Sequence, residues 1–344
     1  MIIRSCAYPR AALVGNPSDG YFGKTIAFVF DNYQAQVQLY ETPELKFLPS
    51  TRDYTEFKNL EDLDNKVDTY GYYGGIRLLK AAARQFYHYC KKHGASPEKS
   101  NFTIRYESDI PNRLGLAGSS AIITAAMRAM FKYYDLQISN AELANLVLAT
   151  ERDELSIPAG LQDRVAQAFN HPVFMDFNRD LMEERGYGDY RCIDIPSGIN
   201  LFVGYRTDLA EGSEILHSRL RSDYNAKVPA VLDAMEEWAE LTEKMTSALQ
   251  QRDHSAIARI IDRNFDLRCE VCASSISEKN MRMVTLAREC GASAKFTGSG
   301  GAIIGTFEDD AMFERLQTTL KQYDVEIIRP RIVTNGVNSV CPEQ

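Results

Sequence analysis

The chain has 344 residues, of which 44% are hydrophobic and 25% are charged. This balance is typical of a folded globular protein with two domains or one large domain. The formal net charge is −8 at pH 7, and no run of basic residues supplies the positive face that a general nucleic-acid-binding protein needs. No stretch approaches 18 consecutive apolar residues, and residues 1–6 lack the apolar core of a signal peptide. We therefore expect a cytoplasmic protein without a membrane-spanning helix.

Seven cysteines are scattered along the chain at irregular spacing, which is typical of free thiols in a reducing compartment. Cys269 and Cys272 form a C-x-x-C pair inside a long helical pattern. No second pair or nearby histidine completes a zinc site. A metal or redox role for this pair is therefore disfavoured.

Strands dominate the first 110 residues. Alternation of apolar and polar residues predicts strands at residues 2–8, 11–15, 25–30, 34–40 and 102–107. Residues 16–20 form a strong turn signal. A polar section at residues 41–68 has no clear period, and a helix is predicted from about residue 72 to residue 93.

Helices dominate the rest of the chain. A capping box, with Ser139 at N-cap and Glu142 at N3, predicts a helix that reaches about residue 155. Helical periodicity predicts further helices at residues 161–169, 224–249, 255–273 and 279–290. A strand is predicted at residues 173–177, residues 302–304 are apolar, and a last helix and strand close the chain.

Residues 111–121, with the sequence PNRLGLAGSSA, lie between a predicted strand and a helical pattern. A glycine-serine loop at the start of a helix offers unpaired N–H groups and the positive end of the helix dipole, which together form an anion site. Gly115 and Gly118 let the backbone approach the anion closely. Ser119 and Ser120 add hydroxyls that bind phosphate or magnesium. The loop is neither a Walker A motif nor a nucleophile elbow, and an ordinary serine-capped turn is the alternative interpretation.

Glu151 shares one face of its predicted helix with Leu143 and Val147. A carboxylate on an inward face needs a partner, because burying it bare is costly. The residues leave two partners open: a magnesium ion, with Ser120 as a second ligand, or an arginine in a salt bridge.

Three further features are weak evidence for a functional site when each is taken alone. Asp163 falls in the first turn of the helix predicted at residues 161–169, where the helix dipole favours its ionised form. Arg10 lies just before a predicted strand, and residues 298–301 make a second glycine-rich loop. Each has a plain structural interpretation: a helix-start aspartate, a charged strand residue and a tight turn.

In combination, these features resemble the galactokinase–homoserine kinase–mevalonate kinase–phosphomevalonate kinase (GHMP) superfamily. Residues 10–19 are similar to its N-terminal substrate motif, residues 115–121 to its phosphate loop, and residues 295–301 to its C-terminal glycine motif. The blocks occur in the family's order and cover most of the chain. The resemblance implies an α+β fold of two domains: an N-terminal domain of mixed β-sheet and helices over residues 1–185, and a ferredoxin-like α+β C-terminal domain over residues 186–344.

Within the superfamily, the sequence is most similar to the glucuronokinases, which are sugar-1-kinases. The matching phrases are residues 15–25, 71–79, 159–167 and 294–302. Asn16 and Pro17 stand where galactokinases carry Glu-His, which disfavours galactose. Galacturonate, fucose and heptose sugars stay open as substrates.

The resemblance implies an ATP-dependent kinase that phosphorylates the anomeric hydroxyl of a uronic acid, with D-glucuronate favoured. Asp163 would accept the hydroxyl proton, and Arg10 would orient Asp163. Ser120 and Glu151 would hold Mg²⁺. The loop residues implied to bind the ATP phosphates are Gly115, Leu116, Ala117, Gly118, Ser119, Ser120 and Ala121.

The resemblance also implies a set of substrate-binding residues. They are Asn16, Ser18, Asp19, Tyr72, Gly74, Gly75, Gly298, Gly300 and Gly301. Lys24 and Arg77 lie in the matching phrases and are candidates for binding the substrate carboxylate.

Two other interpretations stay open: a kinase for another sugar, and a catalytically silent protein of the same fold that senses sugar and ATP. The joint presence of Arg10, Ser120, Glu151 and Asp163 weighs against the sensor. A serine hydrolase that uses Ser119 lacks a histidine partner. The expected partners are a sugar and ATP, with no nucleic acid and no membrane, and the sequence does not fix the oligomeric state.

Overall fold

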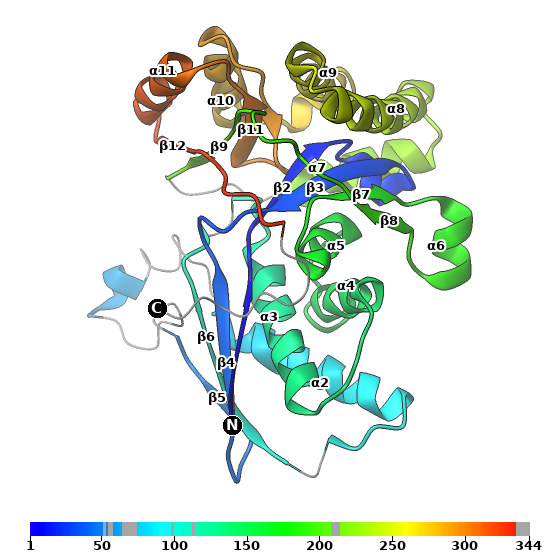
Figure 1. The fold of residues 1–344 in the computed structure, drawn as a ribbon, viewed down its shortest axis with the longest axis vertical. Helices are drawn as coiled ribbons and strands as arrows, with labels where there is room; N and C mark the ends of the chain where they lie inside the picture. Colours follow the sequence, from blue (N-terminus) through cyan, green and yellow to red (C-terminus); the bar gives the residue numbers. More distant parts are fainter. Residues whose placement is uncertain are drawn as a thin grey trace.

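The structure is a computed structural model, and it describes residues 1–50, 53, 58–63, 74–97, 100–111, 114–207 and 214–334. These residues form three four-stranded sheets with helices packed against them (Figure 1). The mixture of helices and sheets confirms the predicted α+β class.

The first sheet has the strand order β1-β4-β6-β5. Its strands are β1 (Ile2–Ala7), β4 (Ala35–Glu41), β5 (Lys46–Leu48) and β6 (Phe102–Ser108). The predicted inward positions of β6 are confirmed, since Phe102, Ile104 and Tyr106 are buried. The helices beside this sheet are α2 (Ile76–Lys92), α3 (Gly118–Tyr133) and α4 (Asn140–Ala149) (Figure 1). Of these, α3 packs directly on β1 and β4.

The second sheet lies near the centre of the molecule and has the order β2-β3-β7-β8. Its strands are β2 (Arg10–Val14), β3 (Lys24–Val29), β7 (Val173–Asp176) and β8 (Asp189–Cys192). Helix α5 (Leu161–Phe169) packs on one side, and α8 (Pro229–Gln251) and α9 (His254–Cys272) pack on the other (Figure 1). The β2–β3 register shifts between Ala12 and Val14, an irregularity of the kind that re-aims neighbouring side chains. Strand β2 and the short 3₁₀ turn Ser18–Tyr21 therefore carry the 10–19 motif through the middle of the fold.

The third sheet is antiparallel and has the order β10-β11-β9-β12. Its strands are β9 (Leu201–Arg206), β10 (Lys295–Phe296), β11 (Ala302–Thr306) and β12 (Val325–Ile328). Helices α10 (Glu278–Glu289) and α11 (Asp310–Lys321) pack against it together with α9. Helices follow the first and third of these strands in the chain, so the connectivity confirms the ferredoxin-like prediction.

The helix predicted at residues 224–249 corresponds to α8, but its predicted start was wrong, because Tyr224 belongs to a separate helix. Helix α7 (Glu214–Asn225) ends before Lys227, which has φ +55°. Pro229 then opens α8 at its first turn, where proline's missing N–H costs nothing.

The capping box predicted at Ser139 and Glu142 is confirmed at the start of α4. The helix that it opens stops being α-helical at Ala149 and continues as a single π turn, Thr150–Glu154. The sequence analysis did not predict β5, α6 (Arg179–Arg185), β8 or β9.

The boundary expected between residues 185 and 186 falls before β8, which pairs with β7 along its whole length. We therefore propose to divide the chain after Cys192, between β8 and β9. One cluster of buried residues crosses this division, since Trp238 of α8 and Phe28 of β3 both belong to it. No helix in the described part of the chain is both long enough and apolar enough to cross a membrane.

Candidate active site

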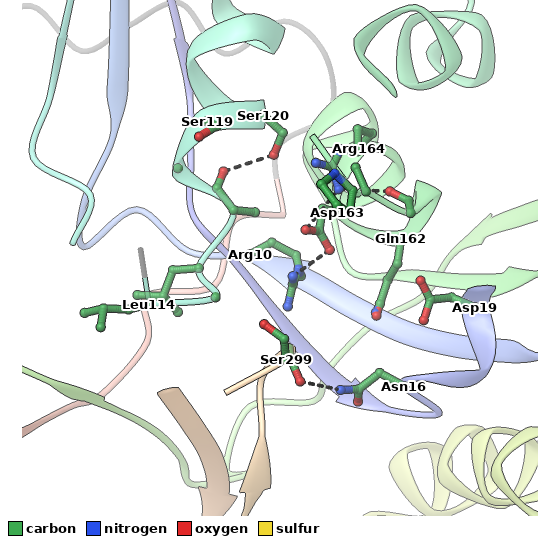
Figure 2. A pocket seen from close by; sticks show the side chains of 18 of the residues that line it. Arg10, Asn16, Asp19, Leu114, Ser119, Ser120, Gln162, Asp163, Arg164 and Ser299 are labelled. Atoms are coloured by element: carbon green, nitrogen blue, oxygen red, sulfur yellow. Dashed lines mark hydrogen bonds and ion pairs between the residues drawn. The ribbon is translucent and has the colours of Figure 1, made fainter. Parts of the chain in front are cut away.

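A cavity opens where the second sheet, the start of α3 and the loop after β10 meet (Figure 2). All three predicted motifs contribute residues to its wall. The predicted site residues that line it are Arg10, Asn16, Asp19, Gly115, Leu116, Ala117, Gly118, Ser119, Ser120, Glu151, Asp163 and Gly298. The fold thus gathers segments from both ends of the chain at one site.

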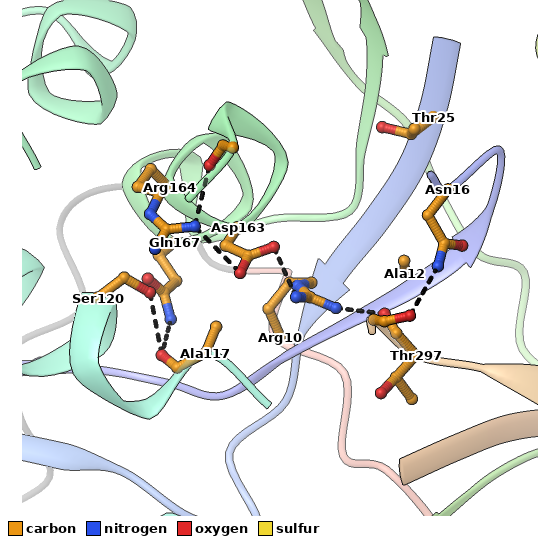
Figure 3. A network of polar contacts seen from close by, with 12 residues as sticks. Arg10, Ala12, Asn16, Thr25, Ala117, Ser120, Asp163, Arg164, Gln167 and Thr297 are labelled. Carbon is orange, nitrogen blue, oxygen red and sulfur yellow. Dashed lines mark hydrogen bonds and ion pairs between the residues drawn. The ribbon is translucent and has the colours of Figure 1, made fainter. Parts of the chain in front are cut away.

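Arg10 and Asp163 form an ion pair in this cavity, with Nη2 of Arg10 2.6 Å from Oδ1 of Asp163. Arg10 is 4% exposed, and its Nη1 donates to the carbonyl oxygen of Thr297 in the loop after β10 (Figure 3). Its backbone N–H donates to the carbonyl oxygen of Leu116 at 3.1 Å. The contact that the resemblance implied is present, and it fixes the direction in which the Asp163 carboxylate faces.

Arg164, the next residue on α5, links two carboxylates. Its Nη1 lies 3.2 Å from Oδ2 of Asp163, and its Nε donates to Oε2 of Glu151 at 2.6 Å. Glu151 is 1% exposed and lies in the π turn, an irregularity frequent at functional sites. Burial raises the pKa of the Glu151 carboxyl, and the Arg164 guanidinium opposes part of that rise. Of the two partners that the sequence left open for Glu151, the arginine is in place.

The glycine-serine loop leaves the N-terminus of α3 open toward the cavity. No side chain caps this helix, and Gly118, Ser119 and Ser120 line the cavity wall. Oγ of Ser120 donates to the carbonyl oxygen of Ala117 at 3.0 Å, and Nε2 of Gln167 donates to the same oxygen at 2.9 Å. A helix start that is held rigidly but not capped is suited to binding an anion.

The second glycine loop packs directly against the first. Gly115 has φ +67°, and a Cβ built on it would lie 2.8 Å from the carbonyl oxygen of Gly300. A Cβ on Gly301 would lie 3.2 Å from Cα of Leu114. Gly300 and Gly301 do not line the cavity, whereas Gly298 does. The absence of a Cβ at Gly115 and Gly301 therefore lets the loops pack backbone to backbone.

Asp19 and Gln162 lie at the end of the cavity away from the serines (Figure 2). Burial raises the pKa of Asp19 to about 7; the negative charge of Asp163 adds to this rise, and Arg10 opposes it. Oε1 of Gln162 is buried and accepts no hydrogen bond from the described residues. This end of the cavity thus offers a carboxyl group and an amide oxygen to a polar ligand.

Two predicted site residues are buried behind the cavity wall and do not face the cavity. Ser18 is fully buried, and its Oγ donates to the carbonyl oxygen of Lys24 at 3.1 Å, which holds the turn after β2. Ala121 is buried inside α3, where its N–H donates to the carbonyl oxygen of Ala117. Neither residue lines the cavity.

The predicted residues around position 74 lie apart from the cavity wall. Gly74 and Gly75 precede α2, where the N–H of Gly75 donates to Oη of Tyr106 at 2.8 Å. Neither glycine lines the cavity. The prediction for Tyr72 falls outside the described residues.

The one lysine and one arginine that were candidates for binding the substrate carboxylate also lie outside the cavity wall. Lys24 pairs with Glu243 at 2.6 Å and with Asp176 at 3.3 Å. Neither Lys24 nor Arg77 lines the cavity.

Of the cavity-wall residues that were assigned no role from the sequence, three have an amide or guanidinium side chain: Gln162, Arg164 and Arg268. Gln162 and Arg164 flank Asp163 and carried no separate signal. Arg268 did carry one, because Ile261 and Phe265 precede it at helical spacing and put it on the apolar face of α9. Burying a charge on such a face is costly unless a partner or ligand compensates it.

Ser120 and Glu151 fit a magnesium ion by the chemistry of their oxygens. Both Arg164 contacts to Glu151 go to Oε2, and within the described ranges no donor reaches Oε1. The Ser120 hydroxyl gives its proton to Ala117, which leaves its oxygen lone pairs for a cation. No three His, Cys, Asp or Glu side chains of the described residues form a metal site by themselves. A cation here would therefore complete its shell with water or phosphate oxygens.

Two family models match this chain. The family model described as GHMP kinases N terminal domain matches residues 77–171, and the one described as GHMP kinases C terminal matches residues 245–324. The chain belongs to the GHMP kinase family, and membership of a kinase family implies the use of ATP.

Two curated relatives from Arabidopsis thaliana cover most of the chain. One, named probable glucuronokinase 2, is 38% identical over 303 residues, which span 87% of this chain and 82% of that protein. The other, named glucuronokinase 1, is 36% identical over 302 residues, which span 87% and 83%. Among solved structures, the galactokinase of Lactococcus lactis complexed with galactose has a TM-score of 0.75 at 13% identity, over 98% of this chain and 95% of that one. This likeness shows the fold.

Gly115→Ala tests the packing between the two glycine loops. The new Cβ would meet the backbone oxygen of Gly300, which cannot rotate away. Gly94→Ala is the matched control, because Gly94 also has positive φ, +71°, but has nothing within 4 Å of a Cβ. We expect Gly94→Ala to lower the free energy of unfolding by about 1 kcal/mol, and Gly115→Ala by roughly 1–3 kcal/mol more.

Urea denaturation followed by the fluorescence of Trp238, the single tryptophan of the chain, measures both changes. Equal losses in the two variants would contradict the close approach of the loops.

Asp19→Asn tests the raised pKa of Asp19. An unfolded aspartate titrates near pH 4, so between about pH 4 and 7 the folded protein keeps a proton that the unfolded chain releases. The carboxyl therefore costs stability increasingly as pH rises through this window, by at most about 1.4 kcal/mol per pH unit. We expect Asp19→Asn to gain stability relative to the original protein between pH 5 and pH 8 in urea denaturation. A difference independent of pH would show that the Asp19 carboxyl is not buried as described.

Proposed function

We propose that the chain is an ATP-dependent sugar-1-kinase that phosphorylates the anomeric hydroxyl of a uronic acid, D-glucuronate, to give glucuronate 1-phosphate. The observation that carries this proposal is the Asp163–Arg10 pair, which shares one cavity with the open N-terminus of α3. The two relatives named glucuronokinase support the choice of sugar.

The glycine-serine loop binds the phosphates of ATP in this proposal. The backbone N–H groups at the start of α3 and the helix dipole favour a negatively charged group there. The cavity has a volume of about 260 Å³, below the roughly 300–1,000 Å³ of a site that encloses a drug-sized ligand. It therefore holds the end of the triphosphate and one small sugar, and the adenosine extends beyond it.

Asp163 steers the acceptor oxygen and takes its proton. The anomeric oxygen forms a bond to the γ-phosphorus, the bond from that phosphorus to the β,γ-bridging oxygen breaks to release ADP, and the hydroxyl proton passes to Asp163. Arg10 and Arg164 each contact a different carboxylate oxygen, so the carboxylate is held in one orientation. Positioning and charge neutralisation supply most of the rate in phosphoryl transfer.

Ser120 and Glu151 hold Mg²⁺ in this proposal, with Oε1 of Glu151 as the free carboxylate oxygen. The cation would neutralise charge on the phosphates during transfer. Asn16, Asp19 and Gln162 face the sugar at the far end of the cavity. The proposed domains, residues 1–192 and 193–344, both contribute to this wall, through α3 and α5 on one side and α9 on the other.

A panel of sugars tests the choice of substrate. ADP release is measured with D-glucuronate, D-galacturonate, L-fucose, D-galactose and a heptose, and ³¹P NMR identifies the product. We expect the highest kcat/KM with D-glucuronate and a sugar 1-phosphate as the product. A higher kcat/KM with another sugar would change the proposed substrate but not the proposed kinase activity. Sugar-dependent ATP binding without ADP release would instead indicate a sensor.

Asp163→Asn tests the role of the steering carboxylate. Asparagine keeps the shape but cannot take the proton, so we expect kcat to fall by roughly a hundredfold or more while the protein stays folded by tryptophan fluorescence. Asp153→Asn is the matched control, because Asp153 is exposed, pairs only with Arg152 in the described part of the chain, and does not line the cavity. Near-normal turnover in Asp163→Asn would refute the assignment.

Glu151→Gln tests the metal site. Loss of the negative ligand should raise the Mg²⁺ concentration that gives half-maximal rate by roughly tenfold or more. Glu154→Gln, in the same π turn but outside the cavity, should leave the titration unchanged. Because Glu151 also pairs with Arg164, a thermal melt confirms that the variant folds before the titration is interpreted. An unchanged Mg²⁺ titration would remove Glu151 from the ligand set.

A further inference from the structure

Arg268 on α9 is a buried cation in the wall of the cavity. It is 2% exposed, and it lines the same cavity as Arg10 and Asp163. Its Nη1 donates to the carbonyl oxygen of Gly298 and its Nη2 to that of Ser299, each at 2.8 Å. The guanidinium also lies over the ring of Phe296, 4.9 Å from its centroid. These contacts fix the guanidinium in one place before any ligand arrives.

Unlike the other two arginines of the cavity, Arg268 has no carboxylate partner among the described residues. Arg10 pairs with Asp163 and Arg164 pairs with Glu151, whereas Arg268 contacts only neutral carbonyl oxygens and its Nε has no acceptor at all within the described residues. A guanidinium has five N–H donors, so most of its donor capacity is unused. Burial lowers the pKa of Arg268 to about 10, which leaves it charged at neutral pH without a counter-ion. A buried charge of this kind is costly unless a ligand completes it.

Lys295 is a second buried basic residue near this wall, although it does not line the cavity. Lys295 is 1% exposed, and its Nζ donates to Asn16 Oδ1 at 2.5 Å and to two backbone carbonyl oxygens. None of these acceptors is charged. Burial lowers the pKa of Lys295, and the positive charges of Arg268 and Arg10 lower it further. The two arginines therefore disfavour a further positive charge at Lys295, and an anion at this wall would offset the charge of Arg268.

Arg268 and Arg10 both lie beside Gly298. The carbonyl oxygen of Gly298 accepts from Arg268, and a Cβ on the same glycine would lie 3.4 Å from Nη1 and Nη2 of Arg10. Gly298 thus separates the two guanidiniums. In a hexuronate, C1 and the carboxylate-bearing C5 are both bonded to the ring oxygen, so the carboxylate lies about one ring width from the anomeric oxygen. Because Gly298 lies beside both guanidiniums, a ring with its anomeric oxygen at Asp163 and Arg10 can direct its carboxylate toward Arg268.

We propose that Arg268 binds the carboxylate of the hexuronate substrate and thereby sets the preference for uronic acids over neutral sugars. This inference rests on the proposed function. The unused N–H groups of Arg268 form charge-assisted hydrogen bonds to the carboxylate, and its fixed guanidinium loses little freedom on binding. Nothing in this role requires Lys24 or Arg77, which lie outside the cavity.

The test compares Arg268→Gln with the matched control Arg263→Gln. Arg263 lies on the same helix, pairs with Glu237 and Glu270, and does not line the cavity. Calorimetry measures the Kd of D-glucuronate, of its neutral amide D-glucuronamide, and of ATP for each variant. We expect Arg268→Gln to weaken D-glucuronate binding roughly 10- to 100-fold and to change the Kd values of the amide and of ATP by less than about threefold. We expect Arg263→Gln to change none of the three.

Each other outcome overturns the proposal. Equal weakening of D-glucuronate and D-glucuronamide would mean that Arg268 only supports the second glycine loop. Weakening of ATP alone would assign Arg268 to the phosphates. If Arg268→Gln does not fold, Arg268→Lys carries the test, since lysine keeps the charge but not the planar geometry. Arg268→Lys should then weaken the binding of D-glucuronate by about threefold or more relative to the binding of D-glucuronamide. An unchanged ratio of the two Kd values would overturn the proposal.

The failure of the proposed function is recognised separately. If the unaltered protein does not phosphorylate D-glucuronate, the proposed function fails, and no variant is needed to see it. If the unaltered protein phosphorylates D-glucuronate and Arg268→Gln keeps its preference for the acid, only the role of Arg268 fails.

Discussion

Arg10 is the residue on which the geometry of the cavity depends. Its backbone N–H holds the glycine-serine loop through Leu116, and its guanidinium holds Asp163 on α5 and Thr297 in the loop after β10. One buried residue therefore ties together the three segments whose motifs lie far apart in the sequence. Removing its side chain would leave Asp163 without its closest counter-charge and the Thr297 carbonyl without its hydrogen bond, and such losses at a buried pair are costly.

Charge is distributed unevenly along the cavity. At one end, the uncapped start of α3 and two serines offer donors to an anion. In the middle, two arginines hold Asp163 between them. At the other end, Asp19 lies near Gln162 (Figure 2). Arg268 also lines the wall and has no carboxylate partner among the described residues. In the proposed function, the helix start binds the phosphates, Asp163 binds the hydroxyl, and Arg268 binds the carboxylate of an acidic sugar.

Local sequence signals predicted much of the fold. The alternation in β6 and the capping box at Ser139 depend only on neighbours in the chain, and both are present. The break between α7 and α8 was missed because helical periodicity continues across Lys227, although Pro229 marked the start of a new helix. Short strands such as β8 pair with a partner that no local pattern identifies.

The residues of the candidate site were predicted less completely than the elements of the fold. All three motifs contribute residues to the cavity wall. The sequence did not distinguish the motif residues that face the cavity from those that support its wall. Gly301 allows the two glycine loops to pack and Ser18 holds a turn, so both residues support the site without facing the cavity. Arg268 lay outside every motif, and its meaning depends on which carbonyl groups and carboxylates the fold places around it. The charge on the apolar face of α9 was the one available signal.

A crystal structure with D-glucuronate and a non-hydrolysable ATP analogue tests the central claim most directly. The account predicts the γ-phosphate at the N-terminus of α3, beside Ser119 and Ser120, and the anomeric oxygen within hydrogen-bonding distance of Asp163. A nucleotide bound outside this cavity, or a sugar whose anomeric oxygen faces away from Asp163, would contradict it.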